Sequence, residues 1–268
     1  HGRPWRLASV TRRAGRMWEL DIQPAPGTPE LDYHAGQFVW MTEGSRRFPL
    51  YDHPFSIADS PRRPGISLIV KELGDFTNAI GQLRPGTPIG LDGPHGDFVL
   101  EGRAADAVVL VAGGVGIAPV MGLLRDLVAR GDPRPVRLAY AAGAPDKFAC
   151  RDEIAAAAGT LDLGTMLIAE EGGPGWTGET GRLDRARLEL LIEGLDPART
   201  VVMMCGPGAM VSAVADALFD IGLPMENVVY EQFDYAAAST ARKDRLHAAQ
   251  YASLGAALGL AALIFAFL

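Results

Sequence analysis

The chain has 268 residues, of which 48% are hydrophobic and 21% charged, so it is neither a disordered nor a collagen-like protein. With 25 basic and 32 acidic residues it carries a net charge of −7, which excludes a globally basic nucleic-acid-binding protein. Two cysteines, Cys150 and Cys205, are too few for a disulfide scaffold or for the four thiolates of an iron–sulfur cluster, and no metal site is predicted.

Residues 1–102 are predicted to form short strands separated by turns. Apolar runs of strand length occupy residues 37–41, 66–70 and 88–91, and residues 84–87 and 93–96 are turn signals. A short helix is predicted over residues 77–83, with Asp75 or Thr77 near its N-cap. Several strands at this spacing favour a small β-barrel or sandwich.

After Gly102 the pattern changes to apolar runs that alternate with amphipathic segments. The predicted strands are 107–112, 136–142, 166–169, 200–204 and 228–230, and the predicted helices are 119–130, 152–158 and 209–221. Strands that are apolar on both faces and alternate with helices predict a doubly wound parallel sheet. We therefore expect a first domain over residues 1–102 and an α/β domain over residues 103–235.

The end of the chain forms a third predicted unit. Residues 236–250 are small and polar with three basic side chains, and residues 251–268 carry no charge. As a helix, that last segment would span about 27 Å against a hydrocarbon core of about 30 Å. The pattern predicts a transmembrane anchor with the folded domains on the cytoplasmic side of the inner membrane. A docking helix is the alternative, disfavoured because no polar face follows Tyr251.

A glycine-rich loop follows the first strand of the α/β domain. Gly113, Gly114 and Gly116 lie between this strand and a helix that has Pro119 in its first turn. Such a loop lets backbone N–H groups approach a pyrophosphate, although an ordinary strand–helix turn has the same composition. A second anion site is predicted where Lys71 precedes residues 74–77, with a capped helix start as the alternative.

Two further segments contain residue types that suit a flat cofactor. Phe55 could stack on a ring and Ser56 could bond to its edge, whereas the alternative places Phe55 in the core. Cys205 is expected at the carboxyl edge of the sheet, where a helix N-terminus would favour its thiolate. A buried structural cysteine is the alternative there.

Together and in this order, the segments resemble the ferredoxin–NADP reductase superfamily over about residues 4–235. His53-Pro54-Phe55-Ser56 is similar to the His-Pro-Phe-Ser/Thr variant of its flavin motif, typical of the ferric reductase and NADPH oxidase branch. Residues 74–77 and 93–96 look like those of the predicted bacterial ferric reductases of this branch. The resemblance implies an FAD-binding β-barrel followed by an NAD(P)-binding domain.

The resemblance also implies a set of site residues. Phe55 would lie along the isoalloxazine, Ser56 near its N5 atom, Cys205 beside the nicotinamide, and the aromatic Phe233 of Glu231-Gln232-Phe233 over the flavin; Ser56, Cys205 and Phe233 are thus expected at the reacting rings. The implied cofactor-binding residues are His53, Pro54, Phe55, Ser56, Ile57, Lys71, Gly74, Phe76, Thr77, Gly113, Gly114, Gly116, Pro119, Cys205, Gly206, Pro207 and Phe233.

The implied function is electron transfer from NAD(P)H through FAD to a membrane haem, ferric iron or oxygen. NADH is slightly favoured because residues 143–145 lack the Ser or Arg that meets a 2′-phosphate. The five histidines include no pair on an apolar helix, so a haem is expected only in a membrane domain before His1 or on another chain. The first residue, which is not Met, is taken as a sign of such a lost domain. The alternatives are the reductase component of an oxygenase and a catalytically silent, membrane-tethered subunit.

Overall fold

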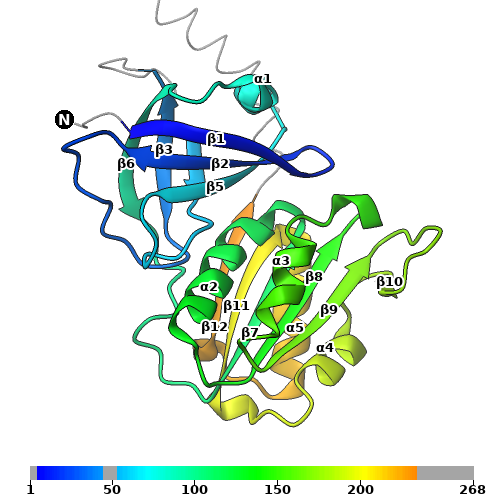
Figure 1. Cartoon of the computed structure of the whole chain (residues 1–268). Coiled ribbons are helices and arrows are strands. Elements are labelled where there is room, and N and C mark those ends of the chain that lie inside the picture. The colour runs from blue at the N-terminus through cyan, green and yellow to red at the C-terminus, as the bar shows by residue number, and fades with distance from the viewer. Residues whose placement is uncertain (1–4, 45–52, 234–268) are drawn as a thin grey trace, which may run out of the picture.

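A computed structural model describes residues 5–44 and 53–233, which form two stacked units (Figure 1). The first unit contains one six-stranded antiparallel sheet in the order β4-β3-β6-β1-β2-β5. Its elements are β1 (Trp5–Ala14), β2 (Met17–Pro24), β3 (Phe38–Glu43), β4 (His53–Ser56), β5 (Ile66–Lys71), α1 (Asp75–Ala79), a 3₁₀ turn (Ile80–Gln82) and β6 (Pro88–His95).

The first sheet curls so that its two edge strands approach each other. Ile57, directly after β4, forms an isolated antiparallel bridge with Leu68 of β5. Side chains that alternate along the strands fill the interior, among them the fully buried Leu20, Ile22 and Val39. The antiparallel β-sheet domain expected from the sequence is thus present.

One predicted turn is wrong. Residues 93–96 carry the composition of a turn, but β6 continues through Gly93 and Pro94 to His95. The β3–β6 register shifts between Phe38 and Trp40, and Phe38 then pairs with His95. This irregularity accommodates the extra residues while the strand continues, which composition alone does not reveal.

The second unit contains a six-stranded parallel sheet in the order β10-β9-β8-β7-β11-β12. Its strands are β7 (Ala107–Gly113), β8 (Val136–Ala142), β9 (Leu163–Ala169), β10 (Glu179–Thr180), β11 (Thr200–Pro207) and β12 (Val228–Phe233). Its helices are α2 (Ile117–Arg130), α3 (Arg151–Ala157), α4 (Arg185–Leu191) and α5 (Gly208–Ile221). The predicted parallel sheet is confirmed, and β10 and α4 are additional to the prediction.

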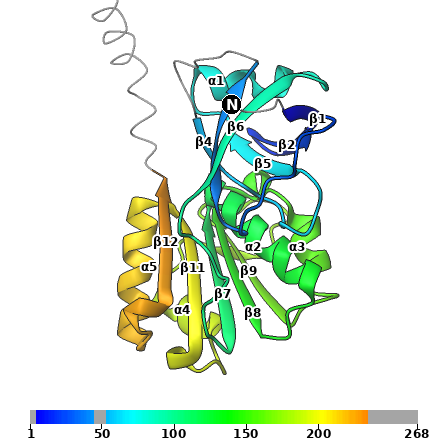
Figure 2. The same ribbon diagram turned by 90° about the vertical axis from the view of Figure 1, so that its left-hand side faces the viewer.

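Helices cover both faces of the parallel sheet, with α2 and α3 on one side and α4 and α5 on the other (Figure 2). Every residue of β7 is buried, because this central strand faces an apolar cluster on each side. The cluster beneath α2 continues into the first unit, where it includes Met17, Ala58 and Ile69. The two units therefore share apolar packing at their junction.

The predicted linker and membrane anchor, residues 236–268, lie outside the described residues. Within the part of the chain that the structure describes, no helix is both long and apolar enough to cross a bilayer.

Candidate active site

A row of three side chains crosses the end of the first sheet. Phe38 of β3 pairs with Ser56 of β4 on one side and with His95 of β6 on the other. The Ser56 side chain is buried, and the Phe38 and His95 ring centroids are 5.6 Å apart. The Nε2 atom of His95 is buried with no hydrogen-bond partner among the described residues, and an Asp92 carboxylate oxygen lies 3.7 Å away. An orphaned polar atom here suits a polar ligand.

The carboxyl ends of two strands of the second unit meet this row. A Cβ atom on Gly96, directly after His95, would lie 3.5 Å from Oε1 of Glu231. Glu231 of β12 pairs in turn with Cys205 of β11. The junction between the units thus brings Ser56 of the first sheet and Cys205 of the second to the same region. In open α/β sheets, ligands bind at this carboxyl end of the strands.

The glycine loop packs directly against the Cys-Gly-Pro segment. A Cβ on Gly116 would lie 2.1 Å from the Cys205 carbonyl oxygen, and a Cβ on Gly113 would lie 2.9 Å from Cδ of Pro207. Gly114 has a φ of +56°, in the left-handed region that favours glycine. Two segments far apart in the sequence therefore form one surface, with Pro119 buried in the first turn of α2 behind them.

The expected thiolate at Cys205 is wrong. The side chain is fully buried, and burial together with the nearby Glu231 carboxyl raises the pKa of the thiol. Strand β11 continues through Pro207, so the sulfur lies in the sheet and not in the first turn of α5. Cys205 is consequently a neutral thiol that cannot act as a nucleophile at physiological pH.

Glu231 has a protonation state that its position in the sequence does not reveal. Burial raises the pKa of its carboxyl to about 7, because the charged form is poorly solvated there. Two residues further on, Phe233 pairs with Pro207 at the same end of the sheet. The only sequence signal for Glu231 was its place in the Glu-x-Phe segment.

An aromatic cluster stands at the start of the predicted flavin segment. The rings of His53 and Phe76 stack with centroids 4.4 Å apart, and Phe55 lies 6.3 Å from Phe76. Pro54 is exposed beside them. Ile57 differs from these residues: its side chain is fully buried in the core, and its N–H donates to the Gln37 carbonyl oxygen. The Ile57 side chain therefore serves the core and lies away from any cofactor surface.

The Thr77 hydroxyl caps the loop that precedes α1. Its Oγ1 accepts hydrogen bonds from the N–H groups of Leu73 (2.8 Å) and Gly74 (2.9 Å). Thr77 thus fixes the backbone of residues 73–74 before α1. The capped helix start, which was the alternative to an anion site here, is present. A Cβ on Gly74 would meet no atom of the described residues within 4 Å, so the backbone there leaves room for a ligand.

Two lysines from different units lie near each other. Burial lowers the pKa of Lys71 at the end of β5, and Lys147 and Arg16 lower it further. Lys147 comes from the loop after β8, where its Nζ atom would lie 3.2 Å from a Cβ on Gly143. Lys147 therefore brings one positive charge from the second unit beside Gly143, directly after β8.

Profiles of known domain families match both units. Residues 6–85 match an "FAD-binding domain" and residues 110–216 an "Oxidoreductase NAD-binding domain". The chain belongs to the FAD-dependent NAD(P)H oxidoreductases. Its two units are the FAD-binding and NAD-binding domains of the ferredoxin–NADP reductase superfamily, as the sequence motifs predicted.

The oxidoreductase is similar to proteins of several kinds. It is 26% identical over 241 residues to the flavohemoprotein of Bacillus subtilis (strain 168), covering 86% of this chain and 59% of that one. It is 28% identical over 238 residues to the reductase component of propane 2-monooxygenase from Mycolicibacterium goodii, covering 85% and 66%. The chain thus spans 59% and 66% of the lengths of these two relatives.

A solved structure has the same fold as the oxidoreductase. The FAD/NAD-binding domain of the nitric oxide dioxygenase from Vibrio cholerae O1 biovar El Tor superimposes with a TM-score of 0.75 at 21% identity. The match covers 87% of this chain and 98% of that domain. At this identity the likeness shows the arrangement of the two domains and leaves the acceptor open.

Two acidic residues that sequence reasoning missed lie beside the nucleotide domain's second strand. The N–H groups of Glu170 and Glu171, after β9, donate to the carbonyl oxygens of Ala142, the last residue of β8 (2.8 Å), and of Gly143, which follows it (3.1 Å). Both glutamates are exposed. In the sequence, no acidic residue closes the second strand, and the neighbouring strand β9 brings these two carboxyl groups to that region through sheet pairing.

Proposed function

We propose that this oxidoreductase transfers a hydride from NADH to FAD at the junction of its two units and then passes single electrons to an acceptor. The observation that carries the proposal is the approach of Glu231, the sheet partner of Cys205, to Gly96 at the end of the row of Phe38, Ser56 and His95. FAD, when bound, supplies the step from two-electron to one-electron chemistry. The chain's own residues bind and orient the two cofactors.

On the flavin side, we assign the ring surface to the first sheet. Phe55 and the His53–Phe76 stack offer apolar faces, and Ser56 offers a hydroxyl. The open backbone at Gly74 and the charge of Lys71 suit the phosphates. The His53 imidazole, which stands where many relatives of this type carry Arg, supplies less permanent charge.

On the nicotinamide side, the residues exclude water and fix orientation. Gly113, Gly116 and Pro207 form a close-packed backbone surface that brings the ring near the first sheet. Cys205 packs a neutral sulfur in the sheet behind this surface, so it supports the backbone there without reacting. No general base is required for this transfer.

Phe233 is proposed to cover the flavin face until the nicotinamide arrives. It lies at the end of β12 opposite Pro207, half-buried against the core. Replacing it, Phe233→Ala, should change the affinity for NADH or the rate constant of flavin reduction, both measured by anaerobic stopped-flow absorbance. Unchanged values of both would contradict this role.

NADH is the proposed donor. The backbone of Glu170 and Glu171 bonds to the carboxyl end of β8, the region where this type of fold holds the adenosine ribose, and both side chains are exposed there. A 2′-phosphate placed there would meet two carboxylates against the single ammonium of Lys147, whereas a ribose hydroxyl can donate a hydrogen bond to either carboxylate.

The proposed acceptor is a haem in a membrane domain, with ferric iron or oxygen as final acceptors. The His-Pro-Phe-Ser segment and the charge-free residues 251–268 after a basic stretch support an enzyme attached to the inner membrane on its cytoplasmic side. A second candidate is the reductase component of an oxygenase, favoured by the similarity to the Mycolicibacterium goodii reductase.

Absorbance of the purified chain tests the proposal. The protein should carry or take up FAD and turn yellow, and NADH should bleach the flavin band anaerobically. Ferric citrate, oxygen, a b-type haem protein and a bacterial oxygenase component, offered separately, should reoxidise it at different rates and so identify the acceptor class. A colourless protein that FAD cannot reconstitute would contradict the proposal and favour the silent subunit.

A further inference from the structure

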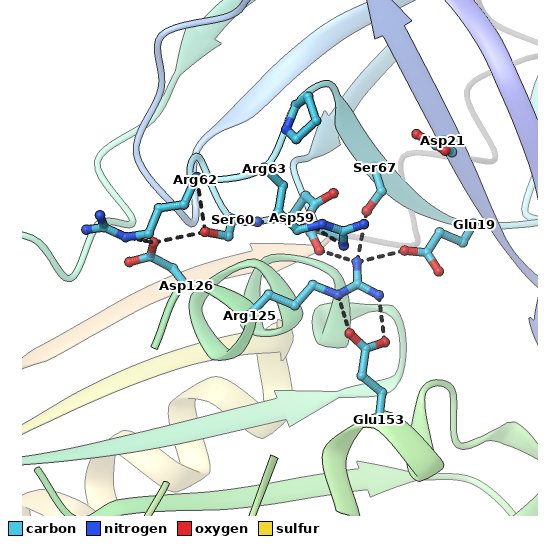
Figure 3. A network of polar contacts seen from close by, with 12 residues as sticks. Glu19, Asp21, Asp59, Ser60, Arg62, Arg63, Ser67, Arg125, Asp126 and Glu153 are labelled. Carbon is cyan, nitrogen blue, oxygen red and sulfur yellow. Dashed lines mark hydrogen bonds and ion pairs between the residues drawn. The ribbon is translucent and has the colours of Figure 1, made fainter. Parts of the chain in front are cut away.

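One arginine side chain at the junction contacts both units. Arg125 lies on α2, and its side chain is only 8% exposed. Figure 3 shows its guanidinium between two sets of partners. Nη1 donates to Glu19 Oε1 (2.7 Å), the Ala58 carbonyl oxygen (2.5 Å) and Ser67 Oγ (2.9 Å), all in the first unit. Nε and Nη2 donate to the two carboxylate oxygens of Glu153 on α3 (2.6 and 2.7 Å).

The geometry of these bonds requires a guanidinium. Its planar fork binds the Glu153 carboxylate in a bidentate manner through Nε and Nη2, while the two N–H bonds of Nη1 are shared among three acceptors from β2, β5 and the segment after β4. A lysine ammonium has three donors on one atom and cannot span both sets of partners. Glu19 also pairs with Arg13, so its buried carboxylate is compensated from two sides.

Helix α2 links this contact to both halves of the active site. Its N-terminal end follows the glycine loop, with Gly116 at the N-cap. On the same helix, a Cβ on Gly122 would lie 2.5 Å from the Ile57 carbonyl oxygen, so α2 rests directly on the backbone that follows Ser56. Ala58, the acceptor of Arg125, is the next residue along that backbone. The helix therefore joins the nucleotide loop to the flavin strand.

We propose that Arg125 is a positioning residue for hydride transfer, which orients α2 and the nucleotide loop against the strand that carries Ser56. The inference rests on the proposed function. In the transfer, the C4–H bond of NADH breaks and its electron pair forms an N–H bond on the flavin. NADH is thereby oxidised to NAD⁺ as the flavin is reduced by two electrons. A displacement of about 1 Å between the reacting atoms costs on the order of a hundredfold in rate.

The test uses the full chain with FAD bound and the variant Arg125→Lys, which keeps the charge but loses the fork. We expect the rate constant of flavin reduction at saturating NADH to fall at least tenfold in anaerobic stopped flow. Reoxidation of the dithionite-reduced flavin by ferricyanide involves no nucleotide and should keep its wild-type rate. Ser67→Ala, which removes one bond to the first unit, should slow reduction by a few fold and covers the case in which Arg125→Lys does not fold.

Arg187→Lys is the matched control. Arg187 donates to Asp184, Glu179 and the Thr180 carbonyl oxygen, all within the second unit, so both half-reactions should keep their wild-type rates. If flavin reduction kept its wild-type rate in both Arg125→Lys and Ser67→Ala, the positioning role of Arg125 would be overturned, while the proposed function would stand. Equal slowing of reduction and ferricyanide reoxidation would also overturn it, because it indicates a general structural role. A wild-type flavin that NADH and NADPH both fail to reduce would overturn the proposed function as well.

Discussion

Glu170 and Glu171 are the residues from which a change of nucleotide preference is expected. The double variant Glu170→Gln/Glu171→Gln removes two negative charges beside the end of β8 and keeps the backbone hydrogen bonds. The ratio of kcat/KM for NADPH to that for NADH should rise by roughly three- to tenfold at low salt and by less at high salt. Glu193→Gln, an exposed site on the far side of the same unit, should leave the ratio unchanged. If the wild type, the double variant and Glu193→Gln all had the same NADPH-to-NADH ratio of kcat/KM, Glu170 and Glu171 would not set the nucleotide preference.

Glu231 should make the stability of the flavin-free protein depend on pH. Its pKa is about 7 in the folded chain, against 4.5 as the ordinary value. Between pH 4.5 and about 7, the folded chain therefore keeps the Glu231 proton that the unfolded chain releases. The contribution of Glu231 to the free energy of unfolding is complete below pH 4.5 and is lost as the pH rises to about 7. In Glu231→Gln, the free energy of unfolding in urea should fall less between pH 5 and 8 than in the wild type. The control Glu226→Gln should follow the wild type. If the free energy of unfolding of Glu231→Gln changed with pH as it does in the wild type, the result would contradict this role of Glu231.

Single residues also mark where sequence reasoning succeeded and where it stopped. The motifs located Ser56, Gly116 and Cys205, which the fold brings to one junction. They did not reveal the protonation state of Cys205, because burial and the Glu231 carboxyl act through the folded sheet. Arg125 carried no motif at all, since its partners come from four separate segments and only folding brings them together.

At the scale of elements, the contact between the glycine loop and β11 gives a sharp prediction. Gly116 has an ordinary helical φ of −58°, so only the space beside the Cys205 carbonyl oxygen excludes a side chain. Gly116→Ala should lower stability by about 1–3 kcal/mol and raise the KM for NADH. Gly131→Ala at the other end of α2, where φ is +57°, should cost about 1–2 kcal/mol without affecting the KM. Thermal unfolding and steady-state kinetics measure both. An unchanged KM for NADH in Gly116→Ala would contradict the proposal that the glycine loop binds the nucleotide.

Long apolar elements were the easiest to predict. Strand β8 has the predicted bounds, and α2, α5 and β7 differ by two residues or fewer at each end. The short strand β10 has only two residues and lacks an apolar signal, and α4 lies in a charged segment, so neither was predicted. In β6, the turn composition at Gly93 and Pro94 hid a strand that pairing with β3 sustains.

At the scale of the whole molecule, attachment to a membrane is a separate prediction. If residues 251–268 anchor the chain, the full chain should stay with the membrane fraction through a sodium carbonate wash, whereas a chain ending at residue 235 should be released. NADH-dependent bleaching should persist in the shortened chain, because the described units contain both proposed cofactor surfaces. Release of the full chain by carbonate would refute the anchor.

The strand order of the parallel sheet has a consequence for synthesis on the ribosome. Strand β7 is hydrogen-bonded to β11, so Ala112 next to the glycine loop pairs with Cys205, far along the chain. During synthesis, the glycine loop lacks its packing contact with β11 until residues 200–207 have left the ribosome. Contacts between segments so far apart in the chain also form slowly. A nascent chain truncated before residue 200 would therefore contain the whole glycine motif and still be unable to retain a nucleotide.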